Sequence, residues 1–246
     1  MASNAALAPS GRQTQQTSFL ASPIKALSDI CAWSTRKRRV KSNGGSLKLN
    51  LGCSISVCEG WVNIDGSHHI LFRKLPEPLL GMLYEHSQMR EVLPKQEYVR
   101  RLRQNEFVHH NLNYGIPFEN ESADYIYTSH FLEHLYPETS RFLLQEIYRT
   151  LKPGGRIRIC VPDLQHAVEL YQRGQKQAFL EYFFLPSTAH AYERHRNMFD
   201  FDTLSSILCE VGYANIERCA YRKGCVPNLD KLDNRPDETL YVEATK

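Results

Sequence analysis

The sequence lacks long apolar runs. No stretch approaches about eighteen consecutive apolar residues, the length at which a membrane-spanning helix becomes a candidate. The chain has 246 residues, of which 42% are hydrophobic and 23% are charged. This length and composition are typical of one globular domain with a buried core. We therefore predict a protein without a transmembrane segment.

The cysteines contain no CxxC pair, and their number, seven, is odd. A disulfide framework is therefore not indicated, and a chain of this length does not need one. Cys219 and Cys225, with a nearby histidine, have no standard zinc-ligand spacing, so we predict no metal site. We interpret the cysteines as reduced thiols and predict a cytoplasmic protein.

Acidic residues are scarce near the amino terminus. Residues 1–45 contain seven lysines and arginines but one acid, Asp29, whereas the remaining residues contain 23 basic and 26 acidic side chains. We predict a basic, flexible leader over residues 1–45, with a weakly amphipathic helix over residues 19–33 that packs on the domain. The alternatives are an organellar transit peptide and a basic patch attracted to anionic lipid or nucleic acid. The mildly acidic body argues against nucleic acid as a partner.

A strand pattern opens the body of the chain at residues 47–65. Leu47, Leu49 and Leu51 alternate with polar residues, which is the period of a strand, and Gly52 follows in a turn. A second short strand over residues 61–64 ends in an acid, Asp65. This arrangement is typical of an α/β sheet that holds a nucleoside, because the backbone approaches the ligand at the glycine and the acid accepts hydrogen bonds from ribose.

A second cluster, over residues 116–163, reads as strand, loop, helix, turn and strand. Residues 107–111 precede it as a third strand, and residues 124–128 form the fourth. Next come Ser129-His130-Phe131-Leu132-Glu133-His134 and a helix from Pro137, whose apolar residues 144, 147, 148 and 151 fall on one face. Pro153-Gly154-Gly155 ends this helix, and residues 156–161 predict the fifth strand.

Together the two clusters resemble the class I S-adenosylmethionine-dependent methyltransferases, in particular the type 11 domain. The core of that domain reads LxLGCG, then an acid, then LPFxxxSFDxVxxSHxLEHL and LKPGGxLxIxVP. The resemblance covers residues 47–164 well, and residues 190–246 look like the end of a subgroup of this type. It implies one Rossmann-like α/β domain over residues 46–246. The sheet is expected to be doubly wound, mostly parallel and seven-stranded, with helices on both faces and an antiparallel last strand.

The resemblance also implies S-adenosylmethionine as the cofactor. Gly52 would permit close backbone approach, Asp65 would take both ribose hydroxyls, and Asn111 would face the adenine. The family pattern has an acid where Asn50 stands, a glycine where Ser54 stands and an aspartate where Asn111 stands. The predicted cofactor-binding residues are Asn50, Gly52, Cys53, Ser54, Asp65, Asn111, Leu112 and Ser129.

His130 and His134 lie four residues apart, so one helical turn would point both in the same direction, beside Glu133. Histidine titrates near neutrality and is a candidate base for a hydroxyl acceptor. A structural or donor-contact role for His134 is the alternative. HFLEH is not HExxH, so a metal pair is not predicted. The predicted catalytic residues are His130, His134 and Asp163, with His190 and His195 as secondary candidates.

Two segments interrupt the minimal sheet. Residues 70–106 form an insertion with helices predicted around residues 79–89 and 96–103. Residues 164–202, which begin helical, form the second segment. Both are predicted as lid or acceptor-side segments, because ligands bind near the carboxyl edge of such sheets. The alternative for the insertion is a helix pair that only covers the sheet. Residues 216–221 and 239–244 predict a closing antiparallel pair.

From these observations we predict S-adenosylmethionine-dependent methyl transfer to oxygen of a small-molecule or sugar-containing acceptor. One alternative is a catalytically silent, methyltransferase-like binding or scaffold protein. A second alternative is a nucleic-acid methyltransferase that uses the basic leader.

Overall fold

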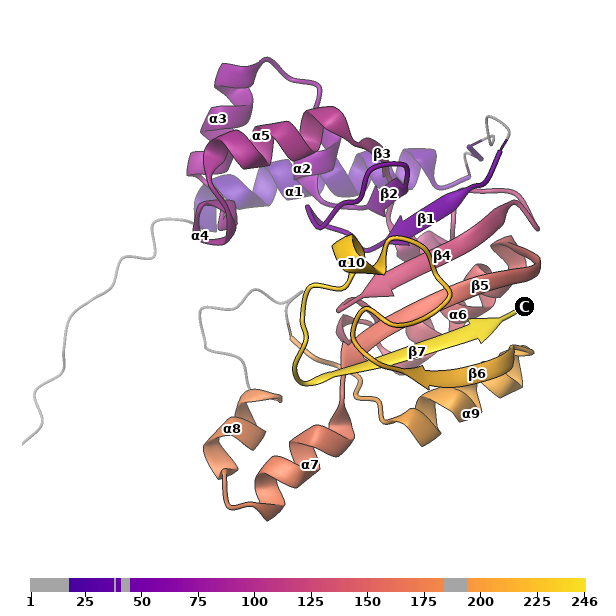
Figure 1. Ribbon diagram of the computed structural model, residues 1–246. Helices are drawn as coiled ribbons and strands as arrows, with labels where there is room; N and C mark the ends of the chain where they lie inside the picture. Colours follow the sequence, from indigo (N-terminus) through magenta and orange to yellow (C-terminus); the bar gives the residue numbers. More distant parts are fainter. Residues whose placement is uncertain (1–17, 38, 41–44, 184–193) are drawn as a thin grey trace, which may run out of the picture.

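The computed structural model describes residues 18–37, 39–40, 45–183 and 194–246. Its centre is a seven-stranded sheet in the order β3-β2-β1-β4-β5-β7-β6 (Figure 1). β7 runs antiparallel to both of its neighbours, and the other pairs are parallel. The strands are β1 (Lys48–Leu51), β2 (Val62–Asp65), β3 (Glu106–His109), β4 (Ala123–Ser129), β5 (Leu151–Pro162), β6 (Ala214–Cys219) and β7 (Thr239–Thr245).

The predicted fold class is confirmed, including the antiparallel last strand. Strand bounds differ from the predicted ones by one or two residues at most ends. The largest difference is at β5, which begins at Leu151 because that residue pairs with Ala123 before a register shift. Pro153-Gly154-Gly155, predicted as a turn between helix and strand, therefore lies within the span of β5. Gly154 has a φ of +77° there, so the chain still bends at this point.

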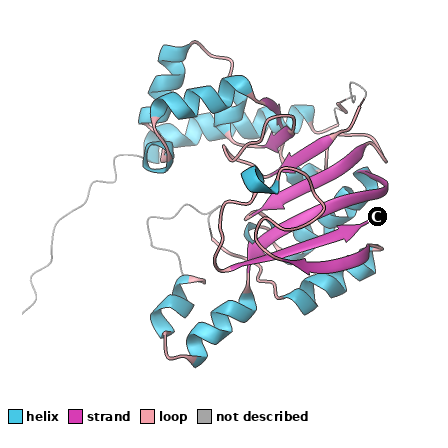
Figure 2. Ribbon diagram, viewed as in Figure 1, coloured by secondary structure: helices cyan, strands magenta, loops and turns pink. Residues whose placement is uncertain are grey.

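The helices surround the sheet unevenly (Figure 2). Helices are found where the sequence predicted them, but the one predicted around residues 79–89 is interrupted after Glu85, and the helical start of residues 164–202 divides into two helices. The helices are α1 (Ser18–Thr35), α2 (His68–Leu71), α3 (Glu77–Glu85), α4 (Met89–Val92), α5 (Lys95–Gln104), α6 (Pro137–Thr150), α7 (Leu164–Gln172), α8 (Lys176–Glu181), α9 (Phe201–Val211) and α10 (Leu229–Leu232), with 3₁₀ turns η1 (Leu112–Tyr114) and η2 (Leu132–His134).

One face of the sheet is covered by α6 and α9 (Figure 1). Leu144 and Ile147 of α6, with Leu204 and Leu208 of α9, are fully buried against the strands in the main hydrophobic core. α9 ends where predicted, at Gly212, which adopts the left-handed conformation that helix C-termini favour.

The opposite face of β4, β5 and β7 is covered differently from the prediction of helices on both faces. A long connection that includes the short α10 packs there through Val226, Leu229 and Leu232. Its anchor is Arg158 of β5, which is fully buried. The guanidinium donates to the carboxylates of Asp233 at 2.6 Å and Glu243 at 3.1 Å and to backbone carbonyls of the connection. A buried cation must be paired in this way, so the connection is held to the sheet.

The insertion of residues 70–106 has its own small core beyond the ends of β2 and β3. Leu80, Tyr98 and Leu102 are buried there, and His69 Nδ1 lies 2.7 Å from the Tyr98 hydroxyl. Figure 1 shows α2–α5 gathered at the end of the sheet toward which β1 points. The insertion therefore lies near the carboxyl edge of the sheet, and its role as a lid or acceptor-side segment stays a prediction.

The predicted leader is docked in the part that the structure describes. Ser28 of α1 donates to the carbonyl of Gly66 at 3.0 Å, and its side chain lies 3.0 Å from His109 Nε2. Further on, Arg39 donates to the Ile116 carbonyl, and Val40 forms a bridge with Phe118. Ser28, Arg39 and Val40 therefore contact the domain, while the flexible leader over residues 1–45 stays a prediction. Residues 1–17, 38 and 41–44 lie outside the described residues.

Within the described ranges, none of the helices combines the length and the apolar character that crossing a membrane requires.

Removing Asp233 is expected to destabilise the fold strongly. Asp233→Ala would leave Arg158 buried with one carboxylate partner fewer, which typically costs about 3–5 kcal/mol. Glu210→Ala is the matched control, because it removes the partner of Arg141 from an exposed ion pair and is expected to cost less than about 1 kcal/mol. Urea unfolding of both variants would measure the difference. Similar losses in the two variants would contradict the assigned role of Arg158.

His69 is expected to make stability depend on acid pH. Burial lowers its pKa from 6.5 to about 3, so between those values the unfolded chain binds the proton more readily, and stability falls as pH falls. A loss of about 1.6 kcal/mol is expected from this group on going from pH 6.5 to about pH 5. His69→Gln should flatten the dependence in urea unfolding at the two pH values, whereas substitution of the exposed His86 by glutamine should not. An unchanged slope in His69→Gln would contradict the assignment.

Candidate active site

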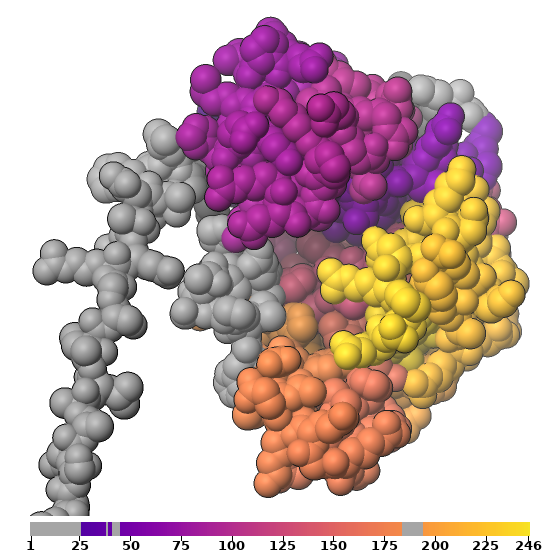
Figure 3. All heavy atoms as spheres, turned by 60° about the vertical axis from the view of Figure 1, so that its left-hand side comes forward, coloured from indigo at the N-terminus to yellow at the C-terminus, as the bar shows by residue number. Residues whose placement is uncertain are grey.

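The carboxyl ends of β1, β2 and β4 meet beside the insertion and form the candidate site. Figure 3 shows this side of the molecule hollowed between the helices of the insertion, in purple, and α7 and α8, in orange. The loops that line the strand ends come from both sequence clusters. Ligands of open α/β sheets bind at this edge.

Gly52 joins the two clusters. It has a φ of +63° and its N–H donates to the Ile64 carbonyl at 2.9 Å. A β-carbon added to Gly52 would lie 2.2 Å from Cγ of Phe131, so the ring of Phe131 packs directly on this glycine. From the sequence, a cofactor is expected to approach the backbone at Gly52. In the structure, the side chain of Phe131 lies beside this glycine.

Asp65 is half-buried at the end of β2. Its Oδ2 accepts a hydrogen bond from the Ser54 N–H at 2.9 Å and its Oδ1 accepts from the Ser67 N–H at 2.7 Å. Each carboxylate oxygen has a further lone pair, so the fixed carboxylate can still accept from two ribose hydroxyls. The adjacent Ser67 Oγ and His110 Nε2 are buried without a hydrogen-bond partner among the described residues. This donor and acceptor set fits a nucleoside.

Asn50 and Ser54 have roles that the family comparison alone did not reveal. The Asn50 amide is buried and donates to the Ser56 carbonyl at 2.8 Å and to Asn63 Oδ1 at 2.9 Å, so it shapes the loop from within. Ser54 has a φ of +47°, the left-handed region that glycine enters at no steric cost. A glycine at this position of the family pattern is therefore explained by backbone conformation.

The other predicted cofactor residues lie around the same edge. Asn111 caps η1, its Oδ1 accepting from the Asn113 N–H at 3.0 Å, and Leu112 is buried in the main core. Cys53 is buried, which raises the pKa of its thiol, and Asp65 adds to the effect. Ser129 is half-buried at the end of β4.

His130 follows β4 in a strained backbone conformation, with a φ of +49°. Its N–H donates to the Cys160 carbonyl at 2.8 Å. Its ring nitrogens lie 3.2 Å from Thr239 Oγ1 and 3.2 Å from Glu133 Oε1. A non-glycine residue in this region costs free energy and is often found at functional sites. The structure thus holds the His130 ring against a buried carboxylate.

Glu133 is the buried carboxylate of this cluster, and its side chain is 1% exposed. Its oxygens accept no hydrogen bond from the described residues. Its backbone carbonyl accepts from the N–H groups of Arg196 and Asn197 at 2.7 and 3.1 Å. The site therefore gains a segment that lies more than sixty residues away along the chain.

His134 and His195 meet across Glu133, with ring centroids 5.4 Å apart. His134 Nε2 lies 3.8 Å from Glu133 Oε1. Burial lowers the pKa of His134, and the charge of Glu133 opposes that effect. The sequence predicted His195 as a secondary catalytic candidate and did not include Glu133 among the site residues. The signal available for Glu133 was an acid between two histidines at helical spacing.

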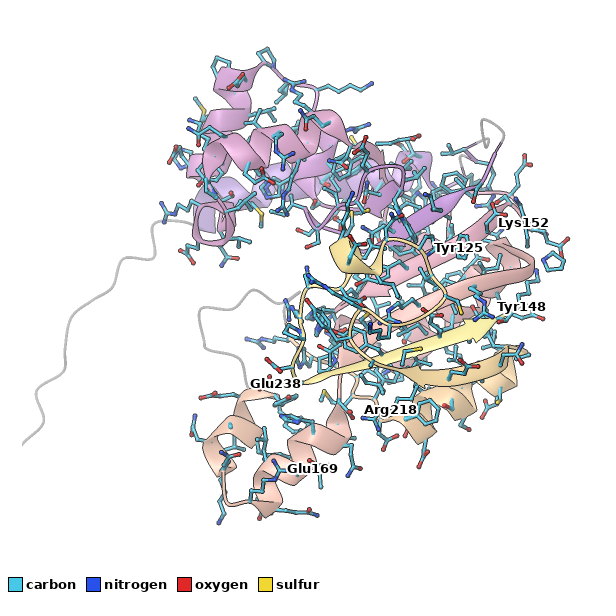
Figure 4. The ribbon with its side chains drawn as sticks, viewed as in Figure 1. Tyr125, Tyr148, Lys152, Glu169, Arg218 and Glu238 are labelled. Atoms are coloured by element: carbon cyan, nitrogen blue, oxygen red, sulfur yellow. The ribbon has the colours of Figure 1, made fainter. Side chains whose placement is uncertain are left out.

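Among the described residues, the Asp163 carboxylate bonds to Gln165 and Arg218, and not to Glu133 or its neighbouring histidines. Its Oδ1 caps α7 by accepting from the Gln165 N–H at 3.0 Å, and its Oδ2 accepts from Arg218 of β6 at 2.6 Å; Arg218 is labelled in Figure 4. Both oxygens thus help to hold α7 to the sheet, and the catalytic role of Asp163 stays a prediction. His190 lies outside the described residues.

A surface hollow at the opposite end of the strands does not belong to this site. It is lined by residues that include Ser46, Asp124, Lys152 and Gly155. Figure 4 shows Lys152 at the end of the sheet far from α2–α5. The hollow therefore lies far from the loops after β1, β2 and β4, and it is not part of the candidate active site.

The comparisons with known proteins agree with the resemblance. The family model of the methyltransferase domain matches residues 80–159, which contain most of the second cluster, whereas the first loop at residues 47–65 lies outside the match. The match confirms the resemblance to methyltransferases where the sequence motifs are most specific.

A curated relative is the demethylmenaquinone methyltransferase of Clavibacter sepedonicus, which is 33% identical over 131 residues, or 49% of this chain and 51% of that protein. The chain thus spans about half the length of this relative. Among solved structures, a SAM-dependent methyltransferase from Archaeoglobus fulgidus has a TM-score of 0.48 at 15% identity, covering 91% of this chain and 94% of that one. A possible histamine N-methyltransferase from Thermotoga maritima has a TM-score of 0.46 at 14% identity, covering 93% and 92%.

Gly52→Ala is expected to destabilise the protein through the contact with Phe131. Gly174→Ala is the matched control, because Gly174 also has a positive φ but has no atom within 4 Å of an added β-carbon. Backbone strain alone should cost about 1–2 kcal/mol in each, so Gly52→Ala should lose more in thermal or urea unfolding. Combining it with Phe131→Ala should recover the excess. Equal losses at Gly52 and Gly174 would contradict the close contact.

Proposed function

We propose that this protein is an S-adenosylmethionine-dependent methyltransferase that methylates oxygen of a small-molecule or sugar-containing acceptor. The observation that carries the proposal is the single edge of the sheet at which the Asp65 loop and the His130–Glu133 pair meet through the Gly52–Phe131 contact. The methyltransferase domain match over residues 80–159 supports the class of reaction.

The donor side is assigned to the first loop. Asp65, held by two backbone N–H groups, would bind the ribose hydroxyls, and Asn111 would face the adenine at the neighbouring strand end. Gly52 and Ser54 would shape the loop beside them. S-adenosylmethionine, when bound, supplies an electrophilic methyl group on a sulfonium sulfur and leaves as the neutral thioether.

The acceptor side is assigned to the loop after β4. A hydroxyl is a poor nucleophile until its proton is removed, so its methylation needs a base within hydrogen-bond reach. His130 would take that proton, and the carboxylate of Glu133, 3.2 Å away, would stabilise the resulting imidazolium. This base favours an oxygen acceptor. The sugar-containing part of the proposal is drawn from the family resemblance alone.

The other assignments follow the same division. The insertion of residues 70–106 and the helices α7 and α8 flank the hollow, and we propose that the insertion and the segment of residues 164–202 select the acceptor. The seven free cysteines support the cytoplasmic placement. The name of the Clavibacter relative gives demethylmenaquinone as its acceptor, and a small-molecule acceptor for this chain is compatible with that name.

A catalytically silent, methyltransferase-like binding or scaffold protein is the second candidate. The observation that favours it is the ring of Phe131 on Gly52, where a cofactor would approach the backbone. Such a domain would bind neither S-adenosylmethionine nor S-adenosylhomocysteine. The two candidates therefore differ in a direct binding measurement.

Asp65→Ala is expected to weaken donor binding. Loss of hydrogen bonds to a charged group should lower the affinity for S-adenosylmethionine and S-adenosylhomocysteine about 10- to 100-fold in calorimetric titration. The matched control is Glu59→Ala, which removes an exposed acid from the same loop and should leave the affinity unchanged. An unaltered affinity in folded Asp65→Ala would remove this residue from the donor site. Absence of binding to the folded wild-type protein would favour the silent domain.

A further inference from the structure

The cluster of Glu133, His134 and His195 has the donor set of a metal site. One ligand atom from each residue, a carboxylate oxygen and two ring nitrogens, lies within 4.8 Å of the others. Two histidines and one carboxylate on neighbouring loops form a donor set used for zinc and other first-row divalent cations. The residues come from η2 and from the segment after residue 193, so their meeting is a product of the fold.

The hydrogen bonds of the two rings fix which nitrogen is available. His195 Nδ1 lies 2.6 Å from the Tyr182 carbonyl, and His134 Nδ1 lies 3.4 Å from the Arg194 carbonyl. A carbonyl oxygen can only accept, so each Nδ1 carries the proton and each Nε2 has a lone pair. Metal-binding histidines are oriented by the same kind of Nδ1 contact.

The state of the Glu133 carboxylate is a second observation that points to a cation, independent of the spacing of the three ligand atoms. Its side chain is 1% exposed, and neither carboxylate oxygen accepts a hydrogen bond from the described residues. His134 Nε2 is 3.8 Å from Glu133 Oε1, so acceptor atoms face each other. A buried carboxylate left in this state is costly. His130 Nδ1, 3.2 Å from Oε1, could donate to that one oxygen, but this would leave Oε2 and the Nε2 lone pairs of the two rings without a partner. A divalent cation would satisfy all of them.

We propose that Glu133, His134 and His195 bind one divalent first-row metal ion, for which Zn²⁺ is the probe. Ligands at about 2.1 Å in tetrahedral geometry lie about 3.4 Å apart, so the donors need to close by on the order of 1 Å. Three protein ligands leave a fourth position open. A hydroxyl bound there becomes more acidic, beside His130. The idea that the cation acidifies the acceptor hydroxyl rests on the proposed function. Binding of the cation to the three residues does not depend on it.

The test is titration of the full-length, chelator-treated protein with Zn²⁺ in the absence of S-adenosylmethionine. One equivalent is expected to bind, and His195→Gln is expected to lower the affinity by more than about 100-fold. His86→Gln removes an exposed histidine outside the cluster and should bind as the wild type does. Glu133→Gln provides a second variant that keeps the side-chain shape, and circular dichroism checks the fold of each.

A parallel titration with Co²⁺ identifies the ligands. Histidine and carboxylate ligands should give visible bands without a strong thiolate charge-transfer band in the near ultraviolet. Failure to bind one equivalent of Zn²⁺, unchanged affinity in folded His195→Gln, or a thiolate band would each overturn the proposal. Donor titration of the metal-free protein is a separate measurement, so failure of the metal site and failure of the methyltransferase function can be told apart.

Discussion

The burial of the Glu133 carboxylate is the constraint on which the candidate site depends. A carboxylate removed from water must be compensated by a proton, by hydrogen bonds or by cations. Here the surrounding groups are the rings of His130, His134 and His195, which come from two distant parts of the chain. The backbone of the same residue binds Arg196 and Asn197. Glu133 thus binds the segment after residue 193 through its main chain, and its side chain faces the rings of His130 and His134.

The rest of the fold keeps that carboxylate at the edge of the sheet. The parallel strands bring the first loop and the HFLEH loop to neighbouring ends, and the Phe131 ring on Gly52 joins them. On the face of the sheet opposite α6 and α9, the hydrogen bonds of the buried Arg158 hold the connection that contains α10 to the sheet. That connection supplies Arg235, which lies 3.4 Å from the His130 ring. The loop after β1, the loop after β4 and the covering connection are therefore linked by direct side-chain contacts.

The sequence predicted what depends on local pattern. Alternation at Leu47, Leu49 and Leu51 located β1, and helical spacing located α6. The family motifs led to the seven-stranded, mostly parallel sheet with an antiparallel last strand. The sequence could not show that Asn50 bonds within its own loop, that Asp163 is used as a helix cap and ion-pair partner, or that His195 reaches Glu133. Those facts depend on side-chain partners brought together by tertiary structure, and neither residue type nor spacing encodes them. The covering of one face by a loop was missed because its anchor, Arg158, reads as a polar residue in a strand.

A crystal structure of the protein with S-adenosylhomocysteine tests the central claim most directly, because the claim concerns two halves of one site. The account predicts the ribose hydroxyls on Asp65, the adenine near Asn111, and the sulfur directed toward the loop that carries His130 and Glu133. It also predicts that Phe131 lines the bound ligand. A ligand bound elsewhere on the molecule, or a sulfur directed away from that loop, would contradict the account.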